Sequence, residues 1–162
     1  MSESVYRSQA PFAERESAVL VIACTSNAFL PYTREFLERH LGLPEGSYDL
    51  LAVPGGGQFL LLTEYLPKFA WVGHRWIKFL VERHRLRRVI VIAHQDCAWY
   101  SEERFIPPFL QRLGVGRSLK DRQREDLREI VQALRQLSLP IAIEAYYAEK
   151  SADGFVRFTK EA

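Results

Sequence analysis

The chain has little cysteine, no excess of charge of one sign and no long apolar run, and each shortage excludes a class of protein. Its two cysteines are too few for the disulfide framework of a secreted protein, so we expect a reducing compartment. A net charge of +2 from 22 basic and 20 acidic residues gives no general field to attract nucleic acid or a membrane surface. No apolar stretch approaches the roughly 18 residues of a membrane-spanning helix, and the polar N-terminal segment lacks the apolar core of a signal peptide. The sequence therefore predicts a cytoplasmic protein whose partners include no nucleic acid and no membrane.

The rest of the composition is that of a globular protein. Hydrophobic residues make up 48% of the 162-residue chain and charged residues 26%, which is ordinary for a folded domain. A chain of this length buries about 68–70% of its unfolded surface. We therefore expect a single domain over residues 1–162, in which residues 1–17 form an N-terminal arm.

Short apolar runs alternate along the chain with stretches of helical periodicity. The runs are rich in β-branched residues, which favours buried strands, and they cover residues 18–23, 48–53 and 88–93. Apolar residues recur at helical spacing over residues 29–41, 63–84 and 117–137. In the last of these helices, Ser118 and Asp121 resemble a capping pair.

The last part of the chain departs from this alternation. The segments IAIEAYY (residues 141–147) and FVRFT (residues 155–159) flank the turn sequence SADG. This pattern predicts two strands joined by a turn. Before them, Pro107 and Pro108 predict a broken helix or a loop within residues 105–114. Strands that alternate with helices indicate an α/β fold, with a mostly parallel central sheet flanked by helices. The C-terminal pair would add an antiparallel strand at one edge of that sheet.

Two of the strands end almost identically, in VIAC and in VIAH, so that Cys24 and His94 take the same place. If these strands are parallel neighbours, about 4.8 Å apart, the two side chains emerge at one edge of the sheet. Cys97 follows His94 closely and can turn back onto that edge. Sulfur and imidazole donors suit zinc, and three protein ligands leave one position open, as in catalytic zinc sites. Asp96 or Asn27 could supply a fourth contact.

Other interpretations of these residues stay open at this point. Free cysteines are among the most buried residues, so two core thiols beside a hydrogen-bonded histidine are one alternative. A disulfide between Cys24 and Cys97 is a second. A third is a cysteine nucleophile, because Cys24 stands at a strand-to-helix turn where a helix N-terminus lowers a thiol pKa, and His94 would activate it.

With a glycine-rich segment after the second strand and His94-Gln95-Asp96-Cys97 after the third, the chain resembles the β-class carbonic anhydrases over residues 18–160. The resemblance implies a zinc ion (Zn²⁺) bound by Cys24, His94 and Cys97. It also implies the family's reaction, in which zinc acidifies bound water and the resulting hydroxide attacks carbon dioxide to give bicarbonate. The closing strand pair resembles the C-terminal end of the family's fold.

The chain departs from the family's pattern beside the first cysteine. The family usually has Cys-x-Asp-x-Arg there. Ser26 stands in place of the aspartate, which orients zinc-bound hydroxide, and Ala28 in place of the arginine that holds this aspartate. Ala98 replaces a glycine, and VPGGG stands where Arg-Asn-Ala-Gly is expected. Because the metal site is intact and the catalytic dyad is not, we expect carbon dioxide hydration to be weak or lost. Ser26 and Asp96 are the candidate catalytic residues.

Other functions are compatible with the same residues. If active, the chain would be a carbonic anhydrase-like zinc lyase; it could also bind zinc and an anion without catalysis, or act as a zinc hydrolase on another small substrate. A metal-free cysteine hydrolase is a further alternative. The Pro54–Gly57 run could bring backbone N–H groups close to a small anion such as bicarbonate, although such a run often forms only a tight turn. We place the candidate anion pocket at Asn27, Gly55 and Gly56.

The stretch YLPKFAWVGHRWIKFLV, residues 65–81, carries apolar side chains around more than one face of the expected helix. Contact with a sheet buries one stripe of a helix, so the remaining apolar surface needs other cover. We therefore expect a homodimer or a higher homo-oligomer, and the family resemblance implies the same. The apolar residues are Phe69, Trp71, Val72, Trp76, Ile77, Phe79 and Leu80.

Overall fold

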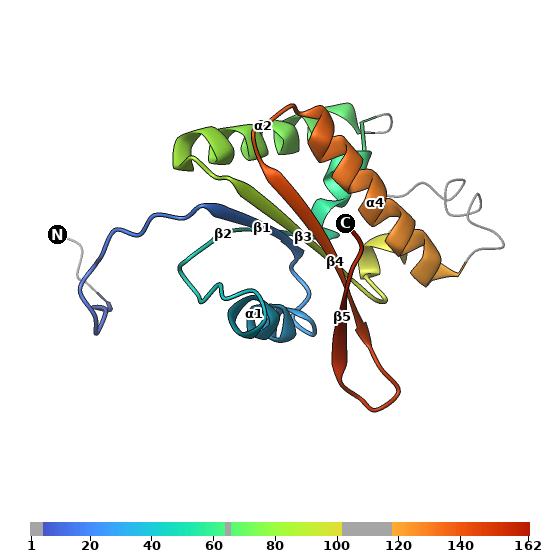
Figure 1. The fold of residues 1–162 in the computed structure, drawn as a ribbon, viewed down its shortest axis with the longest axis horizontal. Helices are drawn as coiled ribbons and strands as arrows, with labels where there is room; N and C mark the ends of the chain where they lie inside the picture. Colours follow the sequence, from blue (N-terminus) through green and yellow to red (C-terminus); the bar gives the residue numbers. More distant parts are fainter. Residues whose placement is uncertain (1–4, 64–65, 102–117) are drawn as a thin grey trace.

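The computed structural model describes residues 5–63, 66–101 and 118–162, and Figure 1 shows a central sheet with helices on both faces. The strands are β1 (Val19–Cys24), β2 (Asp49–Val53), β3 (Arg88–His94), β4 (Ala142–Lys150) and β5 (Val156–Lys160). Within the described ranges, no helix is long and apolar enough to cross a membrane. The broken helix or loop predicted within residues 105–114 lies outside the described residues.

The sheet has the strand order β2-β1-β3-β4-β5. Pairing is parallel between β1 and β2, between β1 and β3, and between β3 and β4, whereas β4 and β5 are antiparallel. This confirms the predicted mostly parallel α/β sheet with an antiparallel edge. After β1 the chain moves outward to β2 and then crosses back to β3, so the direction of winding reverses between β1 and β3. In open α/β sheets ligands bind at the carboxyl ends of the strands at such a reversal.

Helices cover both faces of the sheet because successive side chains of a buried strand point to opposite sides. Leu20 and Ile22 of β1 join the core on the side of α2 (Pro67–His84) and α4 (Leu119–Gln136). Val21 and Ala23 join the core on the side of α1 (Leu30–Arg39). In Figure 1, α1 lies on one side of the sheet, and α2 and α4 lie on the other.

The helix predicted over residues 63–84 begins later than expected. A 3₁₀ helix, η1 (Gly56–Leu61), follows β2, and α2 begins only at Pro67. Proline has no backbone N–H for the bond to the fourth preceding residue, so Pro67 disfavours a helix that runs on from Thr63, whereas proline suits the first turn of a new helix. A second 3₁₀ helix, η2 (Ala98–Ser101), follows β3.

Helix α4 agrees closely with the helix predicted over residues 117–137. The Ser118 side chain accepts a hydrogen bond from the backbone N–H of Asp121 at 3.1 Å, which confirms the capping pair at the start of α4. Its apolar stripe is buried against the sheet. At the other end of the chain, residues 5–17 form neither helix nor strand and are mostly exposed, and the division into one domain with an arm stays a prediction.

Candidate metal centre

The three predicted ligands lie at the carboxyl ends of β1 and β3, where the winding of the sheet reverses. Ala23 is paired with Ile92 in the parallel register, which sets Cys24 and His94 near the same level. After His94 the chain turns sharply, and Asp96 has a positive φ of 52°. Aspartate is one of the few residues besides glycine that adopts this left-handed conformation readily. The turn brings Cys97 back over the ends of both strands.

The ligand atoms of Cys24, His94 and Cys97 all lie within 4.8 Å of one another. The two sulfur atoms are 3.8 Å apart, and both thiols are free. Two thiolates bound at about 2.3 Å to one tetrahedral zinc have sulfur atoms roughly 3.8 Å apart, whereas a disulfide bond measures about 2.05 Å. The spacing therefore matches shared metal ligation and not the disulfide alternative.

The imidazole of His94 is oriented for ligation through Nε2. Its Nδ1 lies 2.8 Å from the carbonyl oxygen of Gln95, so Nδ1 carries the proton and donates it. Nε2 is then left with a lone pair, and this buried atom has no hydrogen-bond partner among the residues that the structure describes. The Phe29 ring stacks on the imidazole at 4.5 Å between centroids and restricts its rotation. An orphaned, fixed acceptor beside two thiols is what a bound metal would satisfy.

The two thiols share one proton unequally. The hydrogen bond from Cys97, together with hydrogen bonds from the backbone of Gly55 and Ser26, outweighs burial and lowers the pKa of Cys24 to about 3. The same hydrogen bond and burial raise the pKa of Cys97. Cys24 is therefore the stronger thiolate, and an incoming metal would displace the proton held by Cys97.

A cavity of about 10 Å³ adjoins the three ligands, which is close to the smallest space that holds one water molecule. It is lined by Cys24, Gly55, Gln58, Ala93, His94, Cys97, Tyr100 and Gln123. Gly55 and Gly56 have positive φ angles of 76° and 60°, which suit glycine. A Cβ on Gly55 would overlap the Trp99 indole, and one on Gly56 would crowd the backbone of Ala23 and Cys24. The glycines thus let this loop close over the strand ends.

The other predicted site residues have varied positions. Ser26 is partly buried, and its carbonyl oxygen accepts the backbone N–H of Leu30 at 2.9 Å. Asn27 and Asp96 are exposed, and Asp96 Oδ2 accepts a hydrogen bond from Gln95 Nε2 at 2.8 Å. Gly55 lines the cavity, whereas Ser26, Asn27 and Asp96 are absent from its described lining. Their roles in catalysis, anion binding or metal ligation stay predictions.

Three polar residues of the cavity wall were not predicted from the sequence: Gln58, Tyr100 and Gln123. Gln58 Nε2 donates to Tyr100 Oη at 2.5 Å. Gln123 interrupts the apolar stripe of α4, since it precedes Leu127 by one helical turn and is as buried as that residue. A polar residue within the apolar stripe of a helix is the feature of the sequence that could have revealed Gln123. Nothing comparable marks Gln58 or Tyr100.

Comparison with known proteins supports the fold. No family model matches the sequence, and no curated protein matches it. Among solved structures, a carbonic anhydrase from Glaciozyma antarctica is 20% identical, with a TM-score of 0.56 over 90% of this chain and 82% of that one. A carbonic anhydrase from Streptococcus mutans is 18% identical, with a TM-score of 0.56 over 91% of this chain and 87% of that one. One β-carbonic anhydrase of the fungal pathogen Aspergillus fumigatus is 15% identical, with a TM-score of 0.60 over 91% of this chain and 77% of that one. The chain therefore has a divergent fold of the β-carbonic anhydrase type.

Proposed function

We propose that this protein binds zinc through Cys24, His94 and Cys97 and that its carbon dioxide hydration is weak or lost. The observation that supports this is the convergence, within 4.8 Å, of two thiols and an imidazole Nε2 that has no partner in the described part of the chain. This donor set suits zinc better than calcium or magnesium, which prefer oxygen ligands. Zinc bound there would supply Lewis acidity and an activated water for attack on carbon dioxide.

The chain's own residues prepare the site in three ways. Gln95 fixes the tautomer of His94 through its carbonyl oxygen, and Cys97 stabilises the thiolate of Cys24. The Trp99 indole, 5% exposed, packs over the loop at Gly55 and keeps bulk water from that side. The cavity of about 10 Å³ beside the three ligands leaves room for no more than about one water molecule.

Efficient hydration needs an acceptor that orients the attacking water, and this chain has no carboxylate at the corresponding position. The Ser26 hydroxyl could accept a hydrogen bond, but it carries no negative charge. Ala28, which is exposed, offers no cation to fix its direction. Loss of one positioned proton-handling group commonly costs about 10²–10⁴-fold in rate.

The test is to measure zinc content and stopped-flow carbon dioxide hydration on the same sample. We expect about one zinc per chain, as in a site with one set of three ligands, and slow hydration. A Ser26→Asp/Ala28→Arg double variant should hydrate faster, because it restores an acceptor and the cation that holds it. Ser26→Asn/Ala28→Arg is the matched control, since it restores size without the carboxylate.

The outcomes separate the remaining alternatives. Hydration by the unmodified protein at rates usual for carbonic anhydrases would contradict the proposed loss. Full zinc content with no hydration, even in the double variant, would favour non-catalytic anion binding or hydrolysis of another small substrate. Absence of zinc would contradict the proposal as a whole and favour a metal-free cysteine hydrolase.

We further propose a cytoplasmic homodimer. Two free thiols 3.8 Å apart are expected in a reducing compartment. The dimer would form through the outer face of α2, where Trp71, Trp76 and Phe79 are 58%, 46% and 59% exposed. The side chain of Phe69 lies outside the described residues, and Ile77 is buried in the core.

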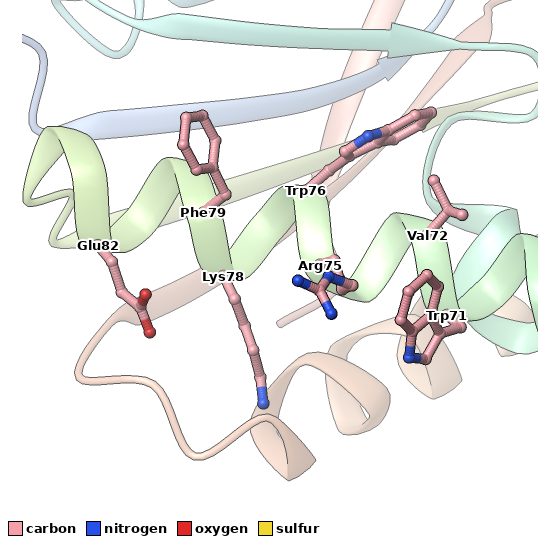
Figure 2. A pocket seen from close by; sticks show the side chains of 7 residues that line it. All are labelled: Trp71, Val72, Arg75, Trp76, Lys78, Phe79 and Glu82. Atoms are coloured by element: carbon pink, nitrogen blue, oxygen red, sulfur yellow. The ribbon is translucent and has the colours of Figure 1, made fainter.

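Figure 2 shows two rows of side chains on this face. One row is apolar: Val72, Trp76 and Phe79. The other is mostly charged: Trp71, Arg75, Lys78 and Glu82. A second α2 packed antiparallel, about a two-fold axis near residues 78 and 79, would place Arg75 of each copy opposite Glu82 of the other. An isologous interface requires self-complementarity of this kind.

A further inference from the structure

Gln123 of α4 is a buried amide with one end paired and the other end unpaired. Its side chain is 1% exposed and lines the cavity beside the three metal ligands. Its Oε1 accepts a hydrogen bond from the buried Tyr147 Oη at 2.6 Å, which fixes the orientation of the amide. Its Nε2 makes no hydrogen bond among the described residues. A buried donor left unpaired is costly, and native structures seldom contain one without a reason.

Two residues that line this cavity carry a buried nitrogen without a partner in the described part of the chain. Gln123 Nε2 can only donate a hydrogen bond, whereas His94 Nε2, whose ring proton is on Nδ1, can only accept one. The cavity of about 10 Å³ holds about one water molecule. Water donates and accepts, so it is the small molecule that suits both the size of the cavity and these groups.

The surroundings of the cavity favour a neutral occupant. The thiolate of Cys24 would repel an anion, and the Asp126 carboxyl group, which accepts hydrogen bonds from Tyr100 and Gln58 of the wall, adds negative charge when ionised. Tyr100 Oη donates to Asp126, accepts from Gln58 Nε2 at 2.5 Å, and can accept one more hydrogen bond. A water molecule therefore has Gln123 as a donor and Tyr100 as an acceptor, within the two to four partners usual for a buried water.

A metal and this water would not compete for the same space. Metal–ligand bonds measure about 2.0–2.3 Å, whereas unbonded atoms in contact lie about 3.5–4.0 Å apart. A metal bound to three atoms that lie within 4.8 Å of one another sits among them, where a water molecule cannot enter. The cavity, which all three ligand residues line, is then left for a fourth ligand.

We propose that Gln123 Nε2 donates a hydrogen bond to one water molecule in this cavity and so positions the fourth ligand of the metal. The inference rests on the proposed zinc site. Gln123 holds the oxygen of this water by donating to it, whereas a carboxylate in place of Ser26 would hold it by accepting its proton. The metal site is thus complete while hydration stays slow, and Gln123 is a positioning residue.

The test combines zinc affinity with crystal structures of the full chain. Gln123→Met keeps the length of the side chain and removes the donor. Its zinc dissociation constant, measured by competition with a chelator, should rise about tenfold or more, the usual cost of losing a group that holds a metal ligand. Gln132→Met, at an exposed position on the same helix, should bind zinc as the unmodified protein does.

The crystal structures report the water directly, which a change in folding stability alone would not move. In the zinc-loaded unmodified protein we expect one ordered water bound to zinc and within hydrogen-bond distance of Gln123 Nε2. It should be displaced or lost in Gln123→Met. Tyr147→Phe removes the internal hydrogen bond but keeps the Nε2 donor, so it should keep the water and lose less zinc affinity than Gln123→Met.

The failure of this inference can be distinguished from failure of the zinc site. If the unmodified protein binds no zinc, both are overturned. If it binds zinc but the fourth ligand is a side chain, or a water out of reach of Gln123 Nε2, only the role of Gln123 is overturned; this result needs no variant to fold. Equal losses of affinity in Tyr147→Phe and Gln123→Met would also overturn it, because the effect would then follow the internal hydrogen bond.

Discussion

Each of the three proposed metal ligands is held by a different local feature. Cys24 continues a buried strand and accepts the Cys97 thiol. His94 ends the neighbouring strand and is fixed by the carbonyl of Gln95. Cys97 depends on the left-handed turn at Asp96. The first two positions could be predicted from the sequence, because parallel strands bring their carboxyl ends to one edge. The tautomer of the imidazole could not, because it depends on a carbonyl orientation that no residue type determines.

The first prediction at this scale concerns the thiol ligands. Cys24→Ser and Cys97→Ser should each reduce zinc content from about one per chain to well under half of that, since a serine hydroxyl is a poor replacement for a thiolate. Metal stabilises the folded state that binds it, so removal of zinc by a chelator should lower the melting temperature of the unmodified protein. The drop should be smaller in the two variants, because they hold less zinc. Ser8→Ala, in the exposed N-terminal segment, is the control. Full zinc occupancy in either cysteine variant would exclude that residue from the site.

The second prediction concerns acid stability. Burial would raise the pKa of Glu144, but hydrogen bonds from Arg88, Tyr146 and Lys160 outweigh it and lower the pKa to about 2. A carboxyl whose pKa is lowered on folding stabilises the protein above its ordinary pKa, near 4.5, and this contribution is lost as the pH falls from there toward 2. Glu144→Gln should therefore be less stable than the unmodified protein at pH 7, and the difference should shrink between pH 5 and pH 2.

Urea unfolding at a series of pH values measures this difference. Glu38→Gln, on the exposed side of α1, should change stability little at any pH. A difference between Glu144→Gln and the unmodified protein that stayed constant down to pH 2 would show that the charge of Glu144 does not contribute.

At the scale of elements, the strands were predicted to within a few residues, and the start of one helix was not. The apolar runs that form β1, β2 and β3 mark buried strands, and the capping pair marks the start of α4. The helix was predicted from residue 63, because the periodic apolar pattern was extended across Pro67, whereas α2 begins at Pro67. Only Pro67 marks the start in the sequence, because proline suits the first turn of a helix and not its interior.

Packing between elements gives the third prediction. Gly73 of α2 faces the buried ring of Phe59 in η1, and a Cβ at position 73 would overlap that ring. Alanine favours a helix over glycine by up to about 1 kcal/mol, whereas overpacking of a core typically costs about 1–3 kcal/mol. Gly73→Ala should therefore lower the free energy of unfolding measured in urea, although alanine has the higher helix propensity. Adding Phe59→Leu should recover part of the loss, and a gain in stability from Gly73→Ala alone would contradict the close contact of α2 with η1.

At the scale of the whole molecule, the outer face of α2 is left exposed by the residues that the structure describes. Residues 65–81 were expected to expose apolar side chains beyond the face that packs on the core, and Trp71, Trp76 and Phe79 are indeed exposed. Arg75 lies 4.8 Å from the centre of the Trp71 ring, so its charge is held over the apolar surface. Arg75, Lys78 and Glu82 form a charged row beside the apolar side chains of α2 (Figure 2). The sequence did not indicate this row, because it depends on which face of the folded helix points away from the core.

The proposed dimer makes a prediction that depends on charge sign. Because Arg75 of one copy would face Glu82 of the other, Arg75→Glu or Glu82→Arg alone places like charges opposite each other at two symmetric points, and each should shift the protein toward monomer. The double variant Arg75→Glu/Glu82→Arg restores opposite charges and should recover the dimer, whereas Glu38→Arg on α1 should have no effect. Light scattering at micromolar to tens of micromolar concentration measures the mass. A monomeric mass for the unmodified protein would contradict the dimer, and a dimer that persisted in both single variants would place its interface elsewhere than on α2.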